Sequence, residues 1–106
     1  MKTVSVTVHF PRGLHARPAA SLVRLFRKFQ ARVCFRLGNR VANAGSILSI
    51  LMLSATVNTQ LEIQATGEDE EAAIRAAEAF FQSDDEEEAR QVYIGGLLGG
   101  EFGEPS

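Results

Sequence analysis

Alternation of apolar and polar residues is the feature that most restricts the fold of this chain. Every second residue is Val or Phe over residues 3–10, and residues 33–37 and 61–65 alternate in the same way. A period of two predicts strands that bury one face and leave the other polar. Because all three strands keep a polar face, we expect an antiparallel sheet covered by helices on one side only.

Segments with helical spacing lie between these strands. Residues 16 to about 29 predict an amphipathic helix with basic residues near its C-terminus. Residues 47–53 follow Ser46, a favoured helix cap, and predict a second helix, although a buried strand also fits so short an apolar run. A third helix, capped by Asp69 or a neighbour, is expected to end near Gln82.

A short fourth strand completes the expected sheet. Gly38-Asn39 is typical of a hairpin turn and leads into residues 40–42. The predicted order is therefore β-α-β-β-α-β-α. This order is an α+β fold, an open-faced sandwich of a four-stranded antiparallel sheet with helices on one face.

Composition limits the class of protein. A chain of 106 residues suits one modest core, and a net charge of −2 favours neither nucleic acid nor an anionic membrane as a partner. The lone Cys34 forms no internal disulfide, the first ten residues alternate unlike a signal peptide, and no stretch is long enough to insert in a membrane. We expect a soluble cytoplasmic domain.

The composition changes after Ser83. Five acidic residues, Asp84 to Glu88, precede a glycine-rich end. We expect one folded domain over residues 1–83 and a flexible acidic, then glycine-rich extension over 84–106, with a short helix as an option for 86–94. Such an extension is either merely disordered or an interaction segment in its own right.

The octet Gly13-Leu14-His15-Ala16-Arg17-Pro18-Ala19-Ala20 holds the candidate site. Pro18 fits near a helix start, where outward N–H groups and the helix dipole favour an anion, and Arg17 suits phosphate oxygens. A histidine at this spot can act as a nucleophile that carries a phosphoryl group. The alternative is that His15 has no functional role and is an ordinary helix cap or surface residue.

The octet resembles the active-site signature of HPr, the histidine phosphocarrier family of the bacterial sugar phosphotransferase system (PTS). The resemblance covers roughly the first 83 residues. Like residues also occur at Leu22-Val23, Phe29, Val33, Gly38, Asn43, Ser46-Ile47 and Ala65-Thr66-Gly67-Glu68-Asp69. It implies the open-faced fold expected above.

The resemblance also implies a role for the site. Nδ1 of His15 would take a phosphoryl group from phospho-Enzyme I and pass it to EIIA-type acceptors, in sugar uptake or in a regulatory branch. Arg17 is expected to act with His15, and Ala16 to support the phosphate. Arg12 replaces the family's usual small polar residue, so it either adds a phosphate contact or points to solvent.

The segment after Gly45 carries the remaining expectations. Many HPr proteins are phosphorylated by a serine kinase at the position of Ser46, but Gly45 stands where regulated members have lysine. The resemblance suggests that Ile47, Leu48 and Met52 form a docking surface for partners. The alternative function is a regulatory docking module that acts through the Ser46 helix without sugar transport.

Two histidines and one cysteine, all well separated, give little support for a metal site. We therefore expect no metal and no cofactor, and the resemblance implies a phosphoryl carrier without enzymatic activity of its own. The family is mostly monomeric, and a monomer is expected here.

Overall fold

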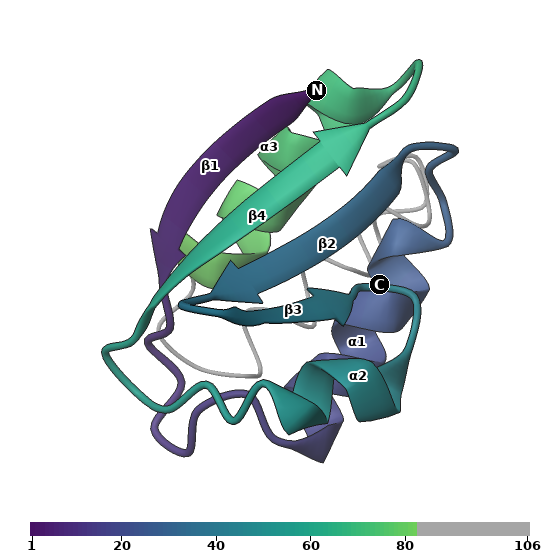
Figure 1. The fold of residues 1–106 in the computed structure, drawn as a ribbon. Coiled ribbons are helices and arrows are strands. Elements are labelled where there is room, and N and C mark those ends of the chain that lie inside the picture. Colours follow the sequence, from purple (N-terminus) through teal and green to yellow (C-terminus); the bar gives the residue numbers. More distant parts are fainter. Residues whose placement is uncertain (83–106) are drawn as a thin grey trace, which may run out of the picture.

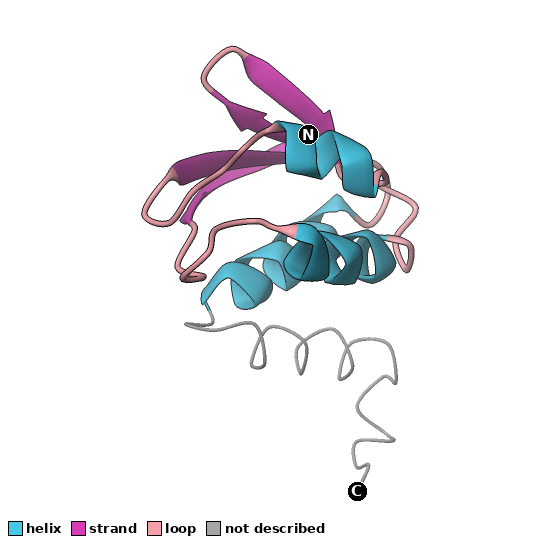
Figure 2. Ribbon diagram, turned by 90° about the horizontal axis from the view of Figure 1, so that it is seen from below, coloured by secondary structure: helices cyan, strands magenta, loops and turns pink. Residues whose placement is uncertain are grey.

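The computed structural model describes residues 1–82, which form one layer of strands and one of helices (Figures 1 and 2). The expectations for residues 84–106 lie outside the described residues. The elements are β1 (Lys2–Thr7), α1 (Ala16–Phe26), β2 (Arg32–Leu37), β3 (Arg40–Asn43), α2 (Ile47–Met52), β4 (Gln60–Thr66) and α3 (Glu70–Gln82).

The four strands form one antiparallel sheet in the order β1-β4-β2-β3. Cys34 pairs with Gln64 on β4 and with Asn43 on β3, and Ser5 of β1 pairs with Glu62. These residues belong to the face without helices, which is polar and open to solvent. The predicted α+β architecture, with helices on one side only, is confirmed.

Phenylalanine rings form the centre of the core between the layers. Phe81 on α3 lies 6.0 Å from the ring of Phe10 and 6.1 Å from that of Phe35 on β2. Phe26 carries the contact on to α1, with its ring 6.0 Å from Phe35. Phe10, Phe35 and Phe80 are fully buried. Burying rings of this size on both helices and the sheet is what holds the two layers together.

Two elements end earlier than expected. β1 stops at Thr7 and not at Phe10, because the N–H of Val8 donates to Thr59 O (2.9 Å) in a loop, beyond the last sheet pair. Val8 and Phe10 are nevertheless buried. The alternation of apolar and polar residues over residues 3–10 therefore predicts burial correctly even past the end of the strand. Helix α1 stops at Phe26 and not near residue 29, since Lys28 N–H bonds only three residues back, to Leu25 O.

A carboxylate explains the direction that the chain takes after α1. Asp69 accepts the N–H groups of Gln30 (2.9 Å) and Ala31 (2.8 Å), and these two bonds hold the α1–β2 loop against the start of α3. Asp69 stands just before α3, as expected for a cap, but these side-chain bonds reach across to the other loop. Glu70 instead accepts from Gly67 N–H at 2.9 Å.

The ambiguous segment after Ser46 is a helix. Ser46 has extended backbone angles, and its Oγ accepts the N–H of Ser49 at 3.2 Å, which is the geometry of an N-cap. Helix α2 packs against β3 and α1. Within residues 1–82, no helix is long and apolar enough to cross a membrane.

Candidate functional site

His15 occupies the N-cap position of α1. Its backbone is extended (φ −92°, ψ −166°), and its carbonyl accepts the N–H of Ala19 at 3.1 Å. The first N–H groups of a helix have no partner inside the helix, and Pro18 has none to offer. The N–H groups of Ala16 and Arg17 therefore lie at the open start of the helix, next to His15 in the chain, where the helix dipole favours an anion.

A close contact with the segment after α2 places this helix start. Leu14 N–H donates to Ala55 O (2.9 Å), and Gly13 N–H donates to Phe10 O (2.8 Å). Gly13 has φ +70°, and a Cβ there would meet Ala55 O and come within 2.9 Å of Thr56 Cα. Only glycine meets both demands, so Gly13 sets the position of His15 two residues later.

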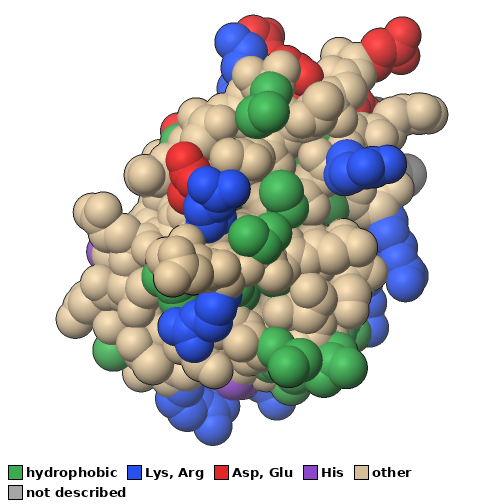
Figure 3. All heavy atoms as spheres, in the orientation of Figure 1, with side chains coloured by type: hydrophobic (Ala, Val, Ile, Leu, Met, Phe, Trp, Pro, Cys, Tyr) green, Lys and Arg blue, Asp and Glu red, His purple; other side chains and the backbone are tan. Residues whose placement is uncertain are grey.

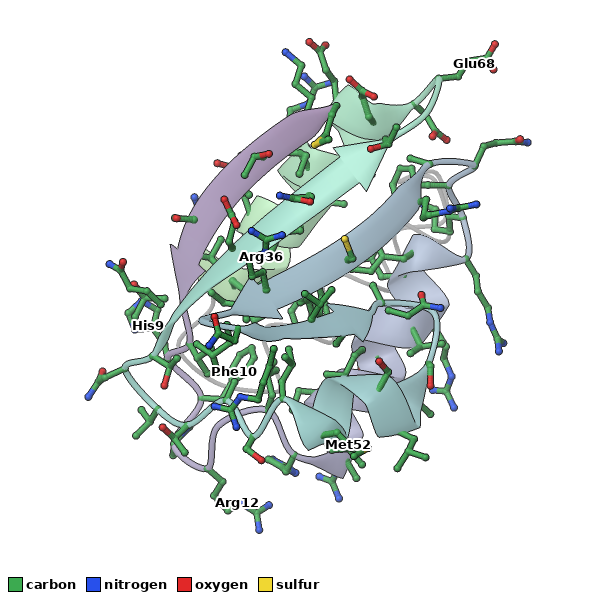
Figure 4. The ribbon with its side chains drawn as sticks, viewed as in Figure 1. His9, Phe10, Arg12, Arg36, Met52 and Glu68 are labelled. Atoms are coloured by element: carbon green, nitrogen blue, oxygen red, sulfur yellow. The ribbon has the colours of Figure 1, made fainter. Side chains whose placement is uncertain are left out.

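Two arginines lie within three residues of His15 in the chain. Arg12 and Arg17 are exposed and His15 is partly exposed. Arg12 projects from the loop before α1, at the same end of the molecule as Met52 (Figure 4). Lys and Arg side chains reach the lower edge of the view in Figure 3, the end where Figure 4 places Arg12, while the acidic side chains of this view lie in its upper half. Such a field favours an anionic group at His15.

The ion pairs given by the described part of the chain lie away from this site. Met1 N-terminus pairs with Glu70 and Lys2 with Glu71, both at the start of α3. Arg36 contacts Glu62 at 3.9 Å on the open face of the sheet. None of these three pairs uses Arg12 or Arg17.

Helix α2 presents apolar side chains to solvent. Leu48 is 67% exposed, Met52 69% and Ile47 41%, whereas Ile50 and Leu53 are buried. Helix α2 packs on α1, the helix that starts at His15. We name Ile47, Leu48 and Met52 the α2 patch. Contiguous exposed apolar side chains of this kind are typical of an interaction site.

Ser46 is engaged in local structure. Its Oγ caps α2, and the neighbouring Ser49 Oγ accepts the N–H of Asn43 at 2.9 Å. Asn43 Oδ1 in turn accepts the N–H of Gly45 at 2.8 Å. These bonds explain Ser46 fully as a cap, and its phosphorylation stays a prediction.

The remaining polar candidates lie elsewhere. His9 is exposed, and Cys34 is half-buried on the open face, where its Sγ lies 3.9 Å from Gln64 Oε1. Among residues 1–82, no group of three His, Cys, Asp or Glu side chains is placed to hold a metal ion.

Sequence reasoning missed two features of the site. The close approach of Gly13 to Ala55 is the first, because nothing in the sequence identifies Ala55 as its neighbour. Ser54, at the end of α2, has φ +56°, a left-handed conformation that its residue type does not signal. Asn58 has the same conformation, with φ +70°, and asparagine is a residue type that tolerates it.

Comparisons with known proteins agree with this geometry. The family model for the PTS HPr component phosphorylation site matches residues 2–83. Phosphocarrier protein NPr of Escherichia coli K12 is 40% identical over 83 residues, 77% of this chain and 90% of the relative. Phosphocarrier protein HPr of Xylella fastidiosa strain Temecula1 is 36% identical over 78 residues, covering 74% and 88%.

Solved structures give the same result. The crystal structure of HPr-C-His from Thermoanaerobacter tengcongensis has a TM-score of 0.76 and 36% identity, and covers 79% of this chain and 94% of its own. Crh from Bacillus subtilis, a catabolite repression protein crystallised as a swapped dimer, has a TM-score of 0.65 and 32% identity over 80% and 98%. The monomeric state expected here stays a prediction.

The fold and the cationic helix start define a small carrier of phosphoryl groups. The chain belongs to the HPr family and is a phosphocarrier component of a PTS, not an enzyme in its own right.

Proposed function

We infer that His15 accepts a phosphoryl group from phospho-Enzyme I and passes it to an EIIA-type acceptor of a cytoplasmic, phosphoenolpyruvate-dependent PTS. The observation that supports this role is the position of His15 at the N-cap of α1, beside the N–H groups of Ala16 and Arg17. No other described histidine has this setting, since His9 lies exposed near the end of β1.

The transfer exchanges one P–N bond for another and needs no reactant besides the phosphorylated donor and His15. The lone pair of Nδ1 on neutral His15 attacks phosphorus in line, and the P–N bond of the donor phosphohistidine breaks. The donor nitrogen keeps that electron pair, and the product carries the new P–N bond on His15. The same exchange, with His15 as donor, delivers the group to the acceptor. The protein's contribution is position and charge, as in phosphoryl transfer generally.

Arg17, Ala16 and Arg12 have distinct roles in this proposal. The N–H of Ala16 and the guanidinium of Arg17 bind phosphoryl oxygens as charge develops on them. Arg12 is exposed on the loop that enters the site, and it adds a second, weaker contact from the other side. The α2 patch docks Enzyme I and the acceptor, because a carrier that serves several partners uses one adaptable surface.

The test is incubation with Enzyme I and phosphoenolpyruvate, followed by measurement of the intact mass. The wild-type chain and His9→Ala should each gain one acid-labile phosphoryl group, and His15→Ala should gain none. His9→Ala is the matched control, since it removes the second imidazole and leaves the helix start unchanged. A phosphoryl group that survives His15→Ala would refute the assignment.

A phosphorylated chain then serves to find the acceptor. Transfer to a sugar-specific EIIA places the protein in uptake, and transfer to an acceptor without a permease places it in a regulatory branch. The relatives include proteins named HPr and NPr, so both acceptor types belong in the assay. A serine kinase that modifies Ser46 would show as a second, acid-stable phosphate, absent from Ser46→Ala.

A further inference from the structure

Charge is distributed very unevenly along this chain. The first acidic residue is Glu62, whereas nine of the eleven Lys and Arg residues precede it. Seven of the thirteen acidic residues come after residue 82, together with a single basic residue, Arg90. Residues 1–82 therefore carry a net charge of +4 and residues 83–106 a net charge of −6. The two parts are complementary in sign.

The end of α3 lies beside the turn that leads into the site. The Phe81 ring is 6.0 Å from that of Phe10, and Phe10 O accepts the N–H of Gly13 at 2.8 Å. Gln82 and His9 line the same surface hollow. The described part of the chain therefore ends, at Gln82, close to the loop that carries Arg12.

The following segment is long enough to cover the site and contains apolar side chains. From residue 83, an extended chain spans about 20 Å by Glu88 and about 40 Å by Ile94. Val92-Tyr93-Ile94 supplies the apolar surface that would match the α2 patch, which is exposed in the structure. The family model ends at residue 83, so this segment is an addition to the matched domain.

We propose that residues 84–94 are an intramolecular ligand of the His15 face: the acidic run pairs with Arg12 and Arg17, and Val92-Tyr93-Ile94 covers the α2 patch. A tethered segment acts at an effective concentration in the millimolar range, so weak contacts suffice for partial occupancy. Partners then reach His15 only in the open fraction of molecules, and their apparent affinity falls by that fraction.

Methionine methyl groups provide a direct test. The chain has two methionines, Met1 and Met52, with exposed fractions of 72% and 69%. Met52 lies in the α2 patch, whereas the amino group of Met1 pairs with Glu70 at the opposite end of α3 from Gln82. With ¹³C-methyl methionine, the Met52 signal reports docking and the Met1 signal is the internal control.

Two full-length variants separate the charged and apolar contributions. The first neutralises the acidic run (Asp84→Asn, Asp85→Asn, Glu86→Gln, Glu87→Gln, Glu88→Gln), and the second is Val92→Ser, Tyr93→Ser, Ile94→Ser. At low ionic strength, the Met52 methyl shift should differ between wild type and both variants, while Met1 stays unchanged. In 1 M salt, where the Debye length is about 3 Å, the wild type and the neutralised variant should converge.

Identical Met52 shifts in all three proteins would overturn the proposal. A Met52 difference that grows with protein concentration would also overturn it, because the contact would then belong to a second copy of the chain. Both results are obtained without any phosphoryl transfer, so they do not depend on the proposed function.

The regulatory consequence rests on the proposed function and has its own measurement. At low salt, the neutralised variant should be phosphorylated by Enzyme I about threefold to tenfold faster than wild type, and equally fast in 1 M salt. If neither protein is phosphorylated, the carrier assignment fails while the methyl result still decides docking. A faster rate with unchanged Met52 shifts would indicate repulsion of the partner and would refute docking.

Discussion

At the scale of single residues, the position of the site is set by a glycine and its affinity for phosphate by charged groups. His15 and Arg17 sit on a helix start whose position relative to α2 is set by Gly13 and its contact with Ala55. The arginines provide the affinity for phosphate, and the backbone contact of Gly13 sets the position of the helix start. Substituting the glycine should therefore affect stability and transfer, whereas substituting an arginine should affect transfer alone.

Substituting Gly13 should damage both stability and transfer. Gly13→Ala forces a side chain into φ +70° and against the backbone of Ala55 and Thr56. The left-handed conformation alone costs about 1–2 kcal/mol, and the loop must also shift. Gly38→Ala is the matched control, since Gly38 has φ +62° with nothing within 4 Å of the added Cβ. The urea concentration at the midpoint of unfolding and the rate of phosphorylation should both fall further for Gly13→Ala than for Gly38→Ala. Equal effects of the two substitutions would contradict this account.

Removing the arginines should affect transfer without affecting stability. A hydrogen bond to a charged group contributes about 1.5–3 kcal/mol, so Arg17→Ala should lower kcat/KM for phosphorylation by about tenfold to a hundredfold. Arg12→Ala should lower kcat/KM for phosphorylation by about threefold. Arg36→Ala, on the open face of the sheet, removes the same charge away from His15 and should have little effect. An effect of Arg36→Ala as large as that of Arg17→Ala would show that only overall charge matters.

At the scale of elements, the end of helix α2 is followed by a strained backbone conformation. Ser54, two residues after the end of α2, has φ +56° at a position where glycine is the usual residue. Ser54→Gly should raise stability by about 0.5 kcal/mol, or about 2–4 °C in Tm, since relief of the strain exceeds the added chain entropy. Ser54→Ala keeps the strain and should give no gain in a thermal melt, so a gain for both variants would point to another cause.

The link between α1 and α3 should be sensitive to acid. The backbone N–H of Gln30 holds the pKa of Asp69 below its ordinary value of 3.8, with a smaller contribution from Ala31 N–H, although partial desolvation opposes the shift. Because the folded pKa is depressed, this stabilisation is present above the ordinary value and is lost as pH falls through the lower, folded value. Stability should therefore fall in acid.

Asp69→Asn tests this link. The variant should melt below wild type at pH 6, and the difference should shrink as the pH is lowered below 3.8, where the wild-type carboxylate becomes protonated. Glu68→Gln, an exposed neighbour, removes a carboxylate from the same loop and serves as the control. A constant difference in Tm across this pH range would show that the charge of Asp69 is irrelevant.

At the scale of the whole molecule, the sequence predicted what depends on periodicity and not what depends on distant contacts. Element order, the open face and the capped helix after Ser46 all follow from local pattern. The early end of β1 does not, since it depends on Thr59, and neither does the path of the chain after α1, which depends on the carboxylate of Asp69, far along the chain. The site divides in the same way: the octet is visible in the sequence, but its contact with Ala55 is not.

Two exposed apolar side chains distinguish the proposed docking surface on α2 from the open face of the sheet. Leu48 is 67% exposed on α2, and Val41 is 59% exposed on the open side of edge strand β3. Substitution of either exposed side chain should change stability by no more than about 0.5 kcal/mol. If the α2 patch docks Enzyme I, Leu48→Ser should raise KM about fivefold to tenfold, as expected for a central interface residue, with little change in kcat. Val41→Ser should leave both constants near wild type. Equal increases in KM would extend the docking surface onto β3, and no increase for Leu48→Ser would remove α2 from it.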